Sequence, residues 1–473
     1  MKFTARGFSS CLIVGVGLLT APVARADLYS AVAAYEKKDH ARAFELFREL
    51  AELGHPVAQE TLALMYVLGE GVKRDNVAGF AWAEISQESG PREKVQPIID
   101  QLGNSLSPEG RARVDELKGQ FGKAALERSL LPALRSPKTP GQFQRSKDDQ
   151  PGCLAIRPSS SARFLPPDPS PDSASGSVMV EATVLSDGRP RNPRALFAIP
   201  PNALEVVARR RAFEFNYENP SVEGARVPCT VNFWIRFTPS AAAKHERQLA
   251  EELAKLNQGV ADRDPVAQLR AAMLMTGWPN LNPDEKNVAP LFIEAAQAGL
   301  PTAQFAVGYI TLGGWGVVPN REKANRWLEL AANAGHHDAE VVLATELLRM
   351  KPDAADVARA RELLEKAAAG GNWNAKYFLA DLLLGDASGA ISADPHRSLE
   401  LLGEVMETME DDPSAFEIRA AALSQAGDFD AAVSAQKRAL ARARKLRWDA
   451  RPQEQRLARY SKSEAWTQRL LDY

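Results

Sequence analysis

Apolar residues recur at helical spacing over most of the chain, and the pattern predicts pairs of antiparallel helices. Ala303, Val307 and Ile310 lie on one face of a predicted helix that ends in a run of glycines. Asn320 is a good N-cap for the following helix, which places Trp327 on its inner side. Because glycine adopts the left-handed backbone conformation of a tight interhelical turn, the two helices should form a hairpin.

The hairpin pattern returns at a fixed interval, which predicts a repeat array. Four alanines are spaced 36 residues apart: Ala267, Ala303, Ala339 and Ala375. Glycines recur at nearly the same interval, at Gly299, Gly335 and Gly370, and near the start of the chain at Gly54 and Gly90. A period of this length is typical of a helical solenoid, in which no hairpin buries its apolar face alone. Such arrays usually bind other proteins along a concave surface.

Two of the hairpins share a loop that resembles a known family. The loops are Gly314-Trp315-Gly316-Val317 and, after Ala58, Gly69-Glu70-Gly71-Val72. They resemble the G-x-G-V loop of the Sel1-like repeat, a relative of the tetratricopeptide repeat. Residues 267–299 and 339–370 have the periodic alanines and glycines but lack this loop. Residues 414–445 resemble a terminal tetratricopeptide repeat. The resemblance implies an α-solenoid and an interaction role, not a reaction.

Between the helical segments the periodicity changes from helical to alternating. Residues 132–175 are rich in Pro, Ser, Asp and Gly, as in a linker. From residue 176 apolar positions alternate, Ser186 to Arg189 reads as a turn, and residues 202–213 read as a short helix. A last strand over 227–237 completes a β-β-α-β order with one sheet face covered by one helix.

This alternating region resembles the C-terminal domain of TonB-family energy transducers. The matching elements are the strand before Asp187-Gly188, the helix ending at Phe213, and the final aromatic strand, while Phe215 stands where the family usually has proline. The resemblance implies binding of a short outer-membrane receptor segment by β-augmentation at a sheet edge. The candidate edge residues are Val227, Thr230, Asn232, Trp234 and Arg236. Because no retained membrane anchor or long proline-rich spacer is evident, a binding module without energy coupling is favoured, and a divergent transducer is the alternative.

The first 26 residues read as a secretory signal peptide. Lys2 and Arg6 precede a short apolar core, and Ala24-Arg25-Ala26 is an A-x-A cleavage site. Cleavage after Ala26 and export to a bacterial periplasm are therefore expected, with no transmembrane helix in the mature chain.

The predicted organisation is a signal peptide at 1–26, Sel1-like repeats at 27–131, a linker at 132–175, the TonB-like domain at 176–239, Sel1-like repeats at 240–411, and a tetratricopeptide-like hairpin with a basic capping tail at 412–473.

Composition adds little chemistry to this picture. The formal net charge is −2, which gives no general indication of nucleic-acid binding. After processing only Cys153 and Cys229 remain, and an oxidising compartment favours their pairing. The six histidines, including His336-His337, lack the spacing of a zinc site, and no catalytic motif is present. We therefore expect a non-enzymatic interaction scaffold without a cofactor; a subunit of an envelope enzyme complex is a further alternative.

Charged runs are interpreted as solvated surface. Arg209-Arg210-Arg211 is expected at a solvated helix end, and Asp411-Asp412 in a solvated turn. Residues 437–473 are basic with interleaved aromatics, which favours a capping helix over a surface for anionic envelope polymers or an acidic partner.

Overall fold

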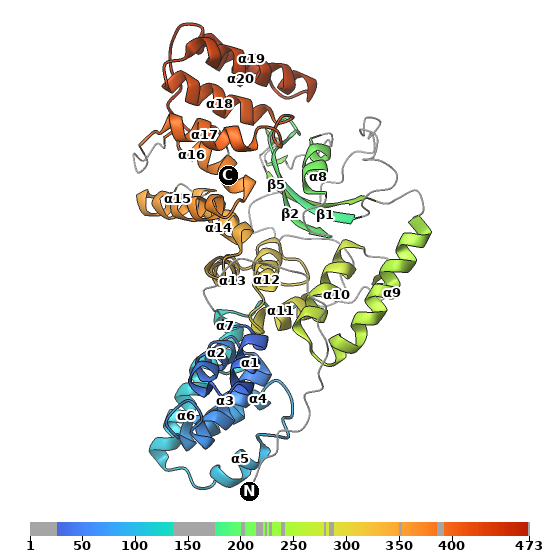
Figure 1. Ribbon diagram of the computed structural model, residues 1–473, viewed down its shortest axis with the longest axis vertical. Coiled ribbons are helices and arrows are strands. Elements are labelled where there is room, and N and C mark those ends of the chain that lie inside the picture. Colours follow the sequence, from blue (N-terminus) through green and yellow to red (C-terminus); the bar gives the residue numbers. More distant parts are fainter. Residues whose placement is uncertain are drawn as a thin grey trace.

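The chain forms a curved array of helical hairpins with a small sheet set against its inner side (Figure 1). In this computed structural model the described residues are 26–135, 176–199, 204–213, 221–222, 225–226, 229–237, 242–278, 281–282, 288–349, 352–385 and 392–471. None of the helices in these ranges is long and apolar enough to cross a membrane. A helical solenoid and a small β-sheet, both predicted from the sequence, are therefore present.

The N-terminal array opens the fold. Its helices are α1 (Leu28–Glu36), α2 (His40–Glu52), α3 (Pro56–Leu68), α4 (Asn76–Gln87), α5 (Gln96–Leu102), α6 (Pro108–Phe121) and α7 (Lys123–Ser129). The α3–α4 loop needs glycine, because Gly71 has φ +73° and a Cβ there would lie 1.9 Å from the carbonyl oxygen of His40. This loop therefore fixes both the turn and the packing of the preceding hairpin, through the start of α2, against it.

The C-terminal array contains the remaining hairpins. Its helices are α9 (Ala242–Ala261), α10 (Pro265–Gly277), α11 (Ala289–Gln297), α12 (Pro301–Gly313), α13 (Arg321–Asn333), α14 (His337–Arg349), α15 (Ala354–Ala369), α16 (Trp373–Leu382), α17 (Pro395–Val405), α18 (Pro413–Gln425), α19 (Phe429–Lys445) and α20 (Arg451–Tyr460). Asn320 caps α13 by accepting a hydrogen bond from the Lys323 backbone N–H at 2.9 Å, as its position before the apolar pattern predicts.

The two arrays are joined by direct contacts as well as by the chain. The fully buried Trp327 of α13 donates its indole N–H to the Leu130 carbonyl at 3.0 Å. The Gln297 amide donates to the Leu53 carbonyl at 3.1 Å. Because these bonds connect α11 and α13 to the N-terminal array, the N-terminal repeats stack directly on the C-terminal ones.

The sheet lies between these arrays in sequence. Its elements are β1 (Gly176–Val184), β2 (Pro190–Ile199), α8 (Glu205–Ala212), β3 (Ser221–Val222), β4 (Ala225–Arg226) and β5 (Cys229–Phe237). The strand order is β2-β1-β5, all antiparallel, and β3 and β4 form a separate small ribbon. One face packs on α8 through Val178, Val180, Ile235 and Phe237 of the strands and Ala208 and Ala212 of the helix. The predicted β-β-α-β order is therefore observed, with the small ribbon added.

Candidate functional site: the concave side of the repeats

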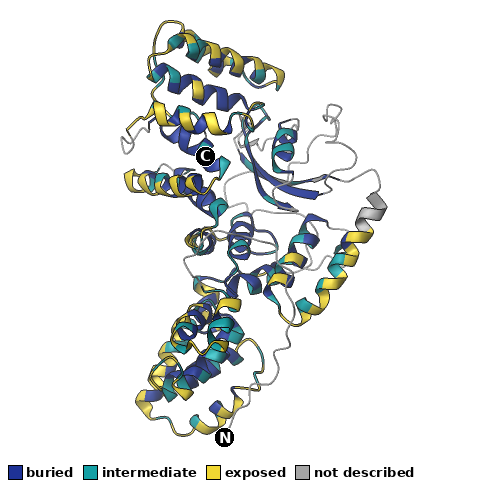
Figure 2. Cartoon of the chain, viewed as in Figure 1, coloured by how far each residue is buried: buried dark blue, intermediate teal, exposed yellow. Residues whose placement is uncertain are grey.

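The second face of the sheet packs into the concave side of the C-terminal array, where sequence analysis placed the partner-binding groove (Figure 1). Phe197 of β2 stacks on Phe305 of α12 with ring centroids 4.9 Å apart, and meets the edge of Tyr309 at 6.1 Å. Phe305 is 0% and Tyr309 2% exposed. The buried inner sides of these helices and of the sheet are visible in Figure 2. This groove is therefore filled by the protein's own sheet.

A buried ion pair fixes the sheet in the groove. Arg194 of β2 lies opposite Glu181 of β1, and its Nε is 2.8 Å from the Glu181 carboxylate. Arg194 also donates to the Thr345 hydroxyl of α14 at 3.0 Å, and the Tyr309 hydroxyl donates to Glu181 at 3.0 Å. Burial alone would raise the pKa of Glu181, but the charges of Arg194 and Arg349 hold that pKa below its ordinary value. The carboxylate is thus ionised, and its charge is matched across the interface.

Helix α8 attaches the sheet to the turn between α17 and α18. Arg209 and Asp412 are both 0% exposed, with Nη1 and Oδ2 3.7 Å apart. Burial raises the pKa of Asp412 to about 6, and Arg209 opposes this only in part. Arg210 forms an ion pair with Asp411 at 2.9 Å, and Arg211 lies over the ring of Phe237 at 4.7 Å. The expectation of a solvated arginine run and a solvated acidic turn is wrong at Arg209 and Asp412, because the two segments bury each other, and wrong at Arg211, which is buried against the sheet.

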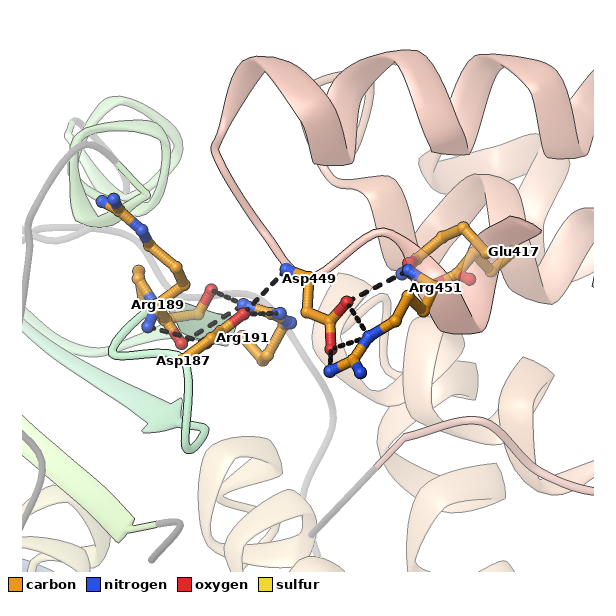
Figure 3. Close-up of polar contacts among 8 residues, drawn as sticks. Asp187, Arg189, Arg191, Glu417, Asp449 and Arg451 are labelled. Carbon is orange, nitrogen blue, oxygen red and sulfur yellow. Dashed lines mark hydrogen bonds and ion pairs between the residues drawn. The ribbon is translucent and has the colours of Figure 1, made fainter. Parts of the chain in front are cut away.

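The β1–β2 turn reaches the corner between α19 and α20 (Figure 3). Asp187 pairs with Arg191 at 2.7 Å and accepts a hydrogen bond from the Asp449 backbone N–H at 3.1 Å. The Arg191 guanidinium stacks on Trp448, 3.4 Å from the ring centroid. Trp448 of the basic tail therefore has a structural contact, and the sheet touches the array from α12 to its last hairpin.

The N-terminal repeat has a different concave side. Residues 56 to 90 and 301 to 335 align loop to loop, so that Glu60 and Leu64 of α3 stand where Phe305 and Tyr309 stand in α12. Glu60 is 6% exposed and forms an ion pair with Lys94, whose Nζ is 3.1 Å away and whose side chain is 68% exposed. Leu64 is half-buried. This concave side is polar and is reached by exposed side chains.

The repeat positions selected from the sequence lie at helix packing points and turns. Ala58, Ala303, Ala339 and Ala375 are 0% exposed and Ala267 is 7% exposed. Gly54, Gly71, Gly90, Gly299, Gly316 and Gly335 all have positive φ. Gly370 does not: the left-handed residue is Gly371, 36 positions after Gly335. A Cβ at Gly370 would lie 2.0 Å from the ring of His337, so this glycine instead makes room for a neighbouring side chain.

The candidate edge residues have mixed positions. β5 is one of the two edge strands of the described sheet, β2 being the other, and the binding of a partner at β5 stays a prediction. Trp234, however, is half-buried and packs toward the repeat helices, because the sheet face assigned to solvent is the one that enters the groove. Thr230 is half-buried; Val227 and the side chains of Asn232 and Arg236 lie outside the described residues. Cys229 is buried and Cys153 lies outside the described residues, so their pairing stays a prediction.

The histidine and acidic residues show no metal arrangement within the described part of the chain, which contains no group of three or more potential ligands. His336 is half-buried and its ring stacks on Phe305 at 4.6 Å; desolvation lowers its pKa. His337 contacts Glu340 at 2.9 Å. These side chains pack between repeats.

A cleft of about 510 Å³ lies between α15, α16 and α17. Its rim is charged, and Arg361 pairs with Glu365 at 2.7 Å across one turn of α15. Lys376 pairs with Glu404 at 2.5 Å between α16 and α17. Because these rim charges neutralise one another, the cleft does not favour a ligand of either sign.

Comparison with known proteins agrees with the hairpin geometry. The fold defines a helical-repeat protein with an intramolecularly bound sheet. A family model for the Sel1 repeat matches residues 33–55, 56–90, 301–336, 351–372 and 373–403. The chain therefore carries Sel1 repeats in both arrays, and such repeats are typically non-enzymatic scaffolds for protein interaction. The resemblance of residues 176–239 to a TonB-family domain gains no support from these comparisons.

Three solved structures are similar to this chain. A Sel1 repeat protein from Oxalobacter formigenes is 18% identical with TM-score 0.36, covering 46% of this chain and 93% of that chain. The protein c5321, a protective antigen of uropathogenic Escherichia coli strains with an SLR fold, is 16% identical with TM-score 0.29. The match covers 92% of this chain and 85% of that chain. Yeast Tom70 is 10% identical with TM-score 0.27, covering 92% and 80%. No curated protein matches the chain.

Proposed function

We propose that this protein is an exported scaffold of the bacterial cell envelope that binds protein partners on the concave side of its N-terminal repeats. The observation that carries the proposal is the difference between the two grooves. The C-terminal groove holds the protein's own sheet, whereas Glu60, Leu64 and the exposed Lys94 line the N-terminal one. Export rests on the signal-peptide pattern of residues 1–26, which lie outside the described residues.

A substitution inside the N-terminal groove tests the proposal. Leu64→Arg places a charge at the half-buried position equivalent to Tyr309 and should abolish crosslinking to envelope proteins. Leu68→Arg is the matched control, because Leu68 lies on the same helix but is 51% exposed at its end. Circular dichroism should show both variants folded at the temperature of the experiment, with Leu64→Arg the less stable of the two because Leu64 packs against the N-terminal core. If folded Leu64→Arg retains every partner, the N-terminal groove is not the recognition surface.

The position of β5 at the edge of the described sheet favours a second candidate, a divergent TonB-family transducer. That function requires residues 1–26 to be kept as an anchor. Mass spectrometry of the exported protein distinguishes the two: an N-terminus at Asp27 supports the scaffold, and a full-length form extracted only with detergent supports the transducer.

A further inference from the structure

The outer side of α19 carries a row of cations at the end of the array. The helix buries Ala432, Ala435, Ala439 and Ala443 on one side and exposes Lys437, Arg438, Arg444 and Lys445 on the other. Figure 2 shows the exposed side of this helix at the top of the molecule. From Lys437 to Lys445 the row extends about 12 Å along the helix axis. Ala441 is the exposed small residue within the row, and Ser434 and the exposed Asp430 continue this face toward the start of the helix.

Most of this row is not neutralised. Arg444 pairs with Glu454 at 2.7 Å. Arg438 lies over the Phe416 ring at 4.4 Å, a contact that leaves its charge in place. Within the described residues Lys437 and Lys445 have no ion-pair partner. The protein as a whole has a formal net charge of −2, so this positive surface is a local feature.

Docking of the sheet extends the row. Arg447 follows α19, and its charge acts on Arg189 of the β1–β2 turn. This turn is held at the corner between α19 and α20 by the stacking of Arg191 on Trp448 and by the pairing of Arg191 with Asp187. Burial and then the charge of Arg447 lower the pKa of Arg189. The nearest acid, Asp187, is already bonded to Arg191. The positive charges of Arg189 and Arg447 are therefore close to each other, and the contacts that hold them there provide no unpaired carboxylate to neutralise them.

The helix dipole does not account for the row. Favourable interaction of cations with a helix C-terminus is confined to the last turn, which contains Arg444 and Lys445. Lys437 and Arg438 lie near the middle of the 17-residue helix. Their positions therefore favour an anionic ligand that runs along the helix.

The chemistry of the patch indicates which ligand. Protein interfaces normally contain an apolar or aromatic centre. The exposed large apolar residues of the described chain are Tyr29, Leu68, Leu134, Val266 and Val318, none of them in α18 to α20. A phosphate-bearing surface requires no such centre. We propose that α19, with Arg447 and Arg189, binds the headgroups of anionic phospholipids, separately from the protein-binding groove.

Vesicle binding tests this proposal. The protein should sediment with vesicles of phosphatidylglycerol and phosphatidylcholine at about 50 mM salt, and release at about 500 mM, where the Debye length is only a few ångströms. Pure phosphatidylcholine vesicles should not bind it. The triple variant Lys437→Gln, Arg438→Gln, Lys445→Gln should lower the partition coefficient about a hundredfold, or about fivefold for each charge.

A second triple variant separates the patch from net charge. Arg359→Gln, Arg361→Gln, Arg397→Gln removes the same charge from exposed side chains that each pair with a glutamate on their own helix. It should bind vesicles within about threefold of the parent, since it leaves the patch intact. Equal loss in both triples, or no binding of the parent, would overturn the proposal. Tighter binding to duplex DNA than to vesicles, lost in the α19 triple, would reassign the patch to nucleic acid.

Discussion

The hairpins 56–90 and 301–335 have the same backbone conformation, but their concave sides differ in chemical character. Both begin with proline, turn at two glycines with positive φ, and bury a tryptophan, Trp82 or Trp327. On the concave side, however, one has Glu60 and Leu64 and the other Phe305 and Tyr309. The repeat fold therefore fixes where the groove is, and a few groove side chains determine what occupies it.

The aromatic groove is occupied permanently by contacts that water does not reach. Arg194 is 4% and Glu181 9% exposed, and both bond to repeat helices. In the polar groove the carboxylate is also buried, since Glu60 is 6% exposed, but its pairing cation, Lys94, is 68% exposed and can rearrange around a partner. The difference separates an internal structural interface from a surface that remains available.

The largest effect should follow from breaking the buried pair. Arg194→Met leaves Glu181 ionised in a buried site without its main partner, which should cost about 3–5 kcal/mol of unfolding free energy. Urea unfolding measures this loss, and increased proteolysis of residues 176–237 should accompany it. The double variant Glu181→Gln, Arg194→Met should recover most of the stability, because no unpaired charge remains. A single-variant cost below about 1 kcal/mol would mean that the sheet is not firmly held in the groove.

A pH effect should arise at the α8 attachment. Because burial raises the pKa of Asp412 from about 4 to about 6, the folded state binds a proton more tightly than the unfolded state. The stabilisation is complete below the unfolded pKa and is lost as pH rises through about 6. Between pH 4 and 7 the difference in unfolding free energy between parent and Asp412→Asn should change by up to about 3 kcal/mol, the parent gaining toward acid.

Asparagine suits this test because its side-chain oxygen can still cap α18 through the Ser414 backbone N–H. Asp411→Asn removes one charge from the same turn and is the matched control. A pH-independent difference for Asp412→Asn would show that the buried carboxyl does not titrate in this range.

The sequence could predict the hairpins because their determinants are local. Glycine at a left-handed turn, an Asn or Asp cap, and an apolar stripe all act within about one hairpin, so the G-x-G-V loops and Asn320 fall where expected. The prediction of a turn glycine at Gly370 is wrong by one residue, since the left-handed turn residue is Gly371. Gly370 is small because His337 packs on it.

The occupied groove could not be predicted, because it depends on contacts between residues more than a hundred positions apart. Arg194 meets Thr345, and Arg209 meets Asp412. One signal was present: Met179 and Trp234 are large apolar residues on the strand face assigned to solvent. A sheet apolar on both faces requires two layers to cover it, and α8 supplies only one.

The smallest effect should come from the polar groove. Lys94→Met removes a mostly exposed partner of Glu60, while Arg92 remains 4.0 Å away. Because Lys94 is solvated and Arg92 still faces Glu60, the unfolding free energy should fall by less than about 1 kcal/mol, and the loss should shrink further at high salt. The loss for Arg194→Met, by contrast, should persist at the same salt concentration, since buried pairs are screened much less. A cost for Lys94→Met above about 2 kcal/mol that salt does not reduce would mean that Lys94 and Glu60 behave as a desolvated pair, since the Glu60 side chain is itself only 7% exposed. The N-terminal groove would then also be closed, and partner binding would have to be sought outside both grooves.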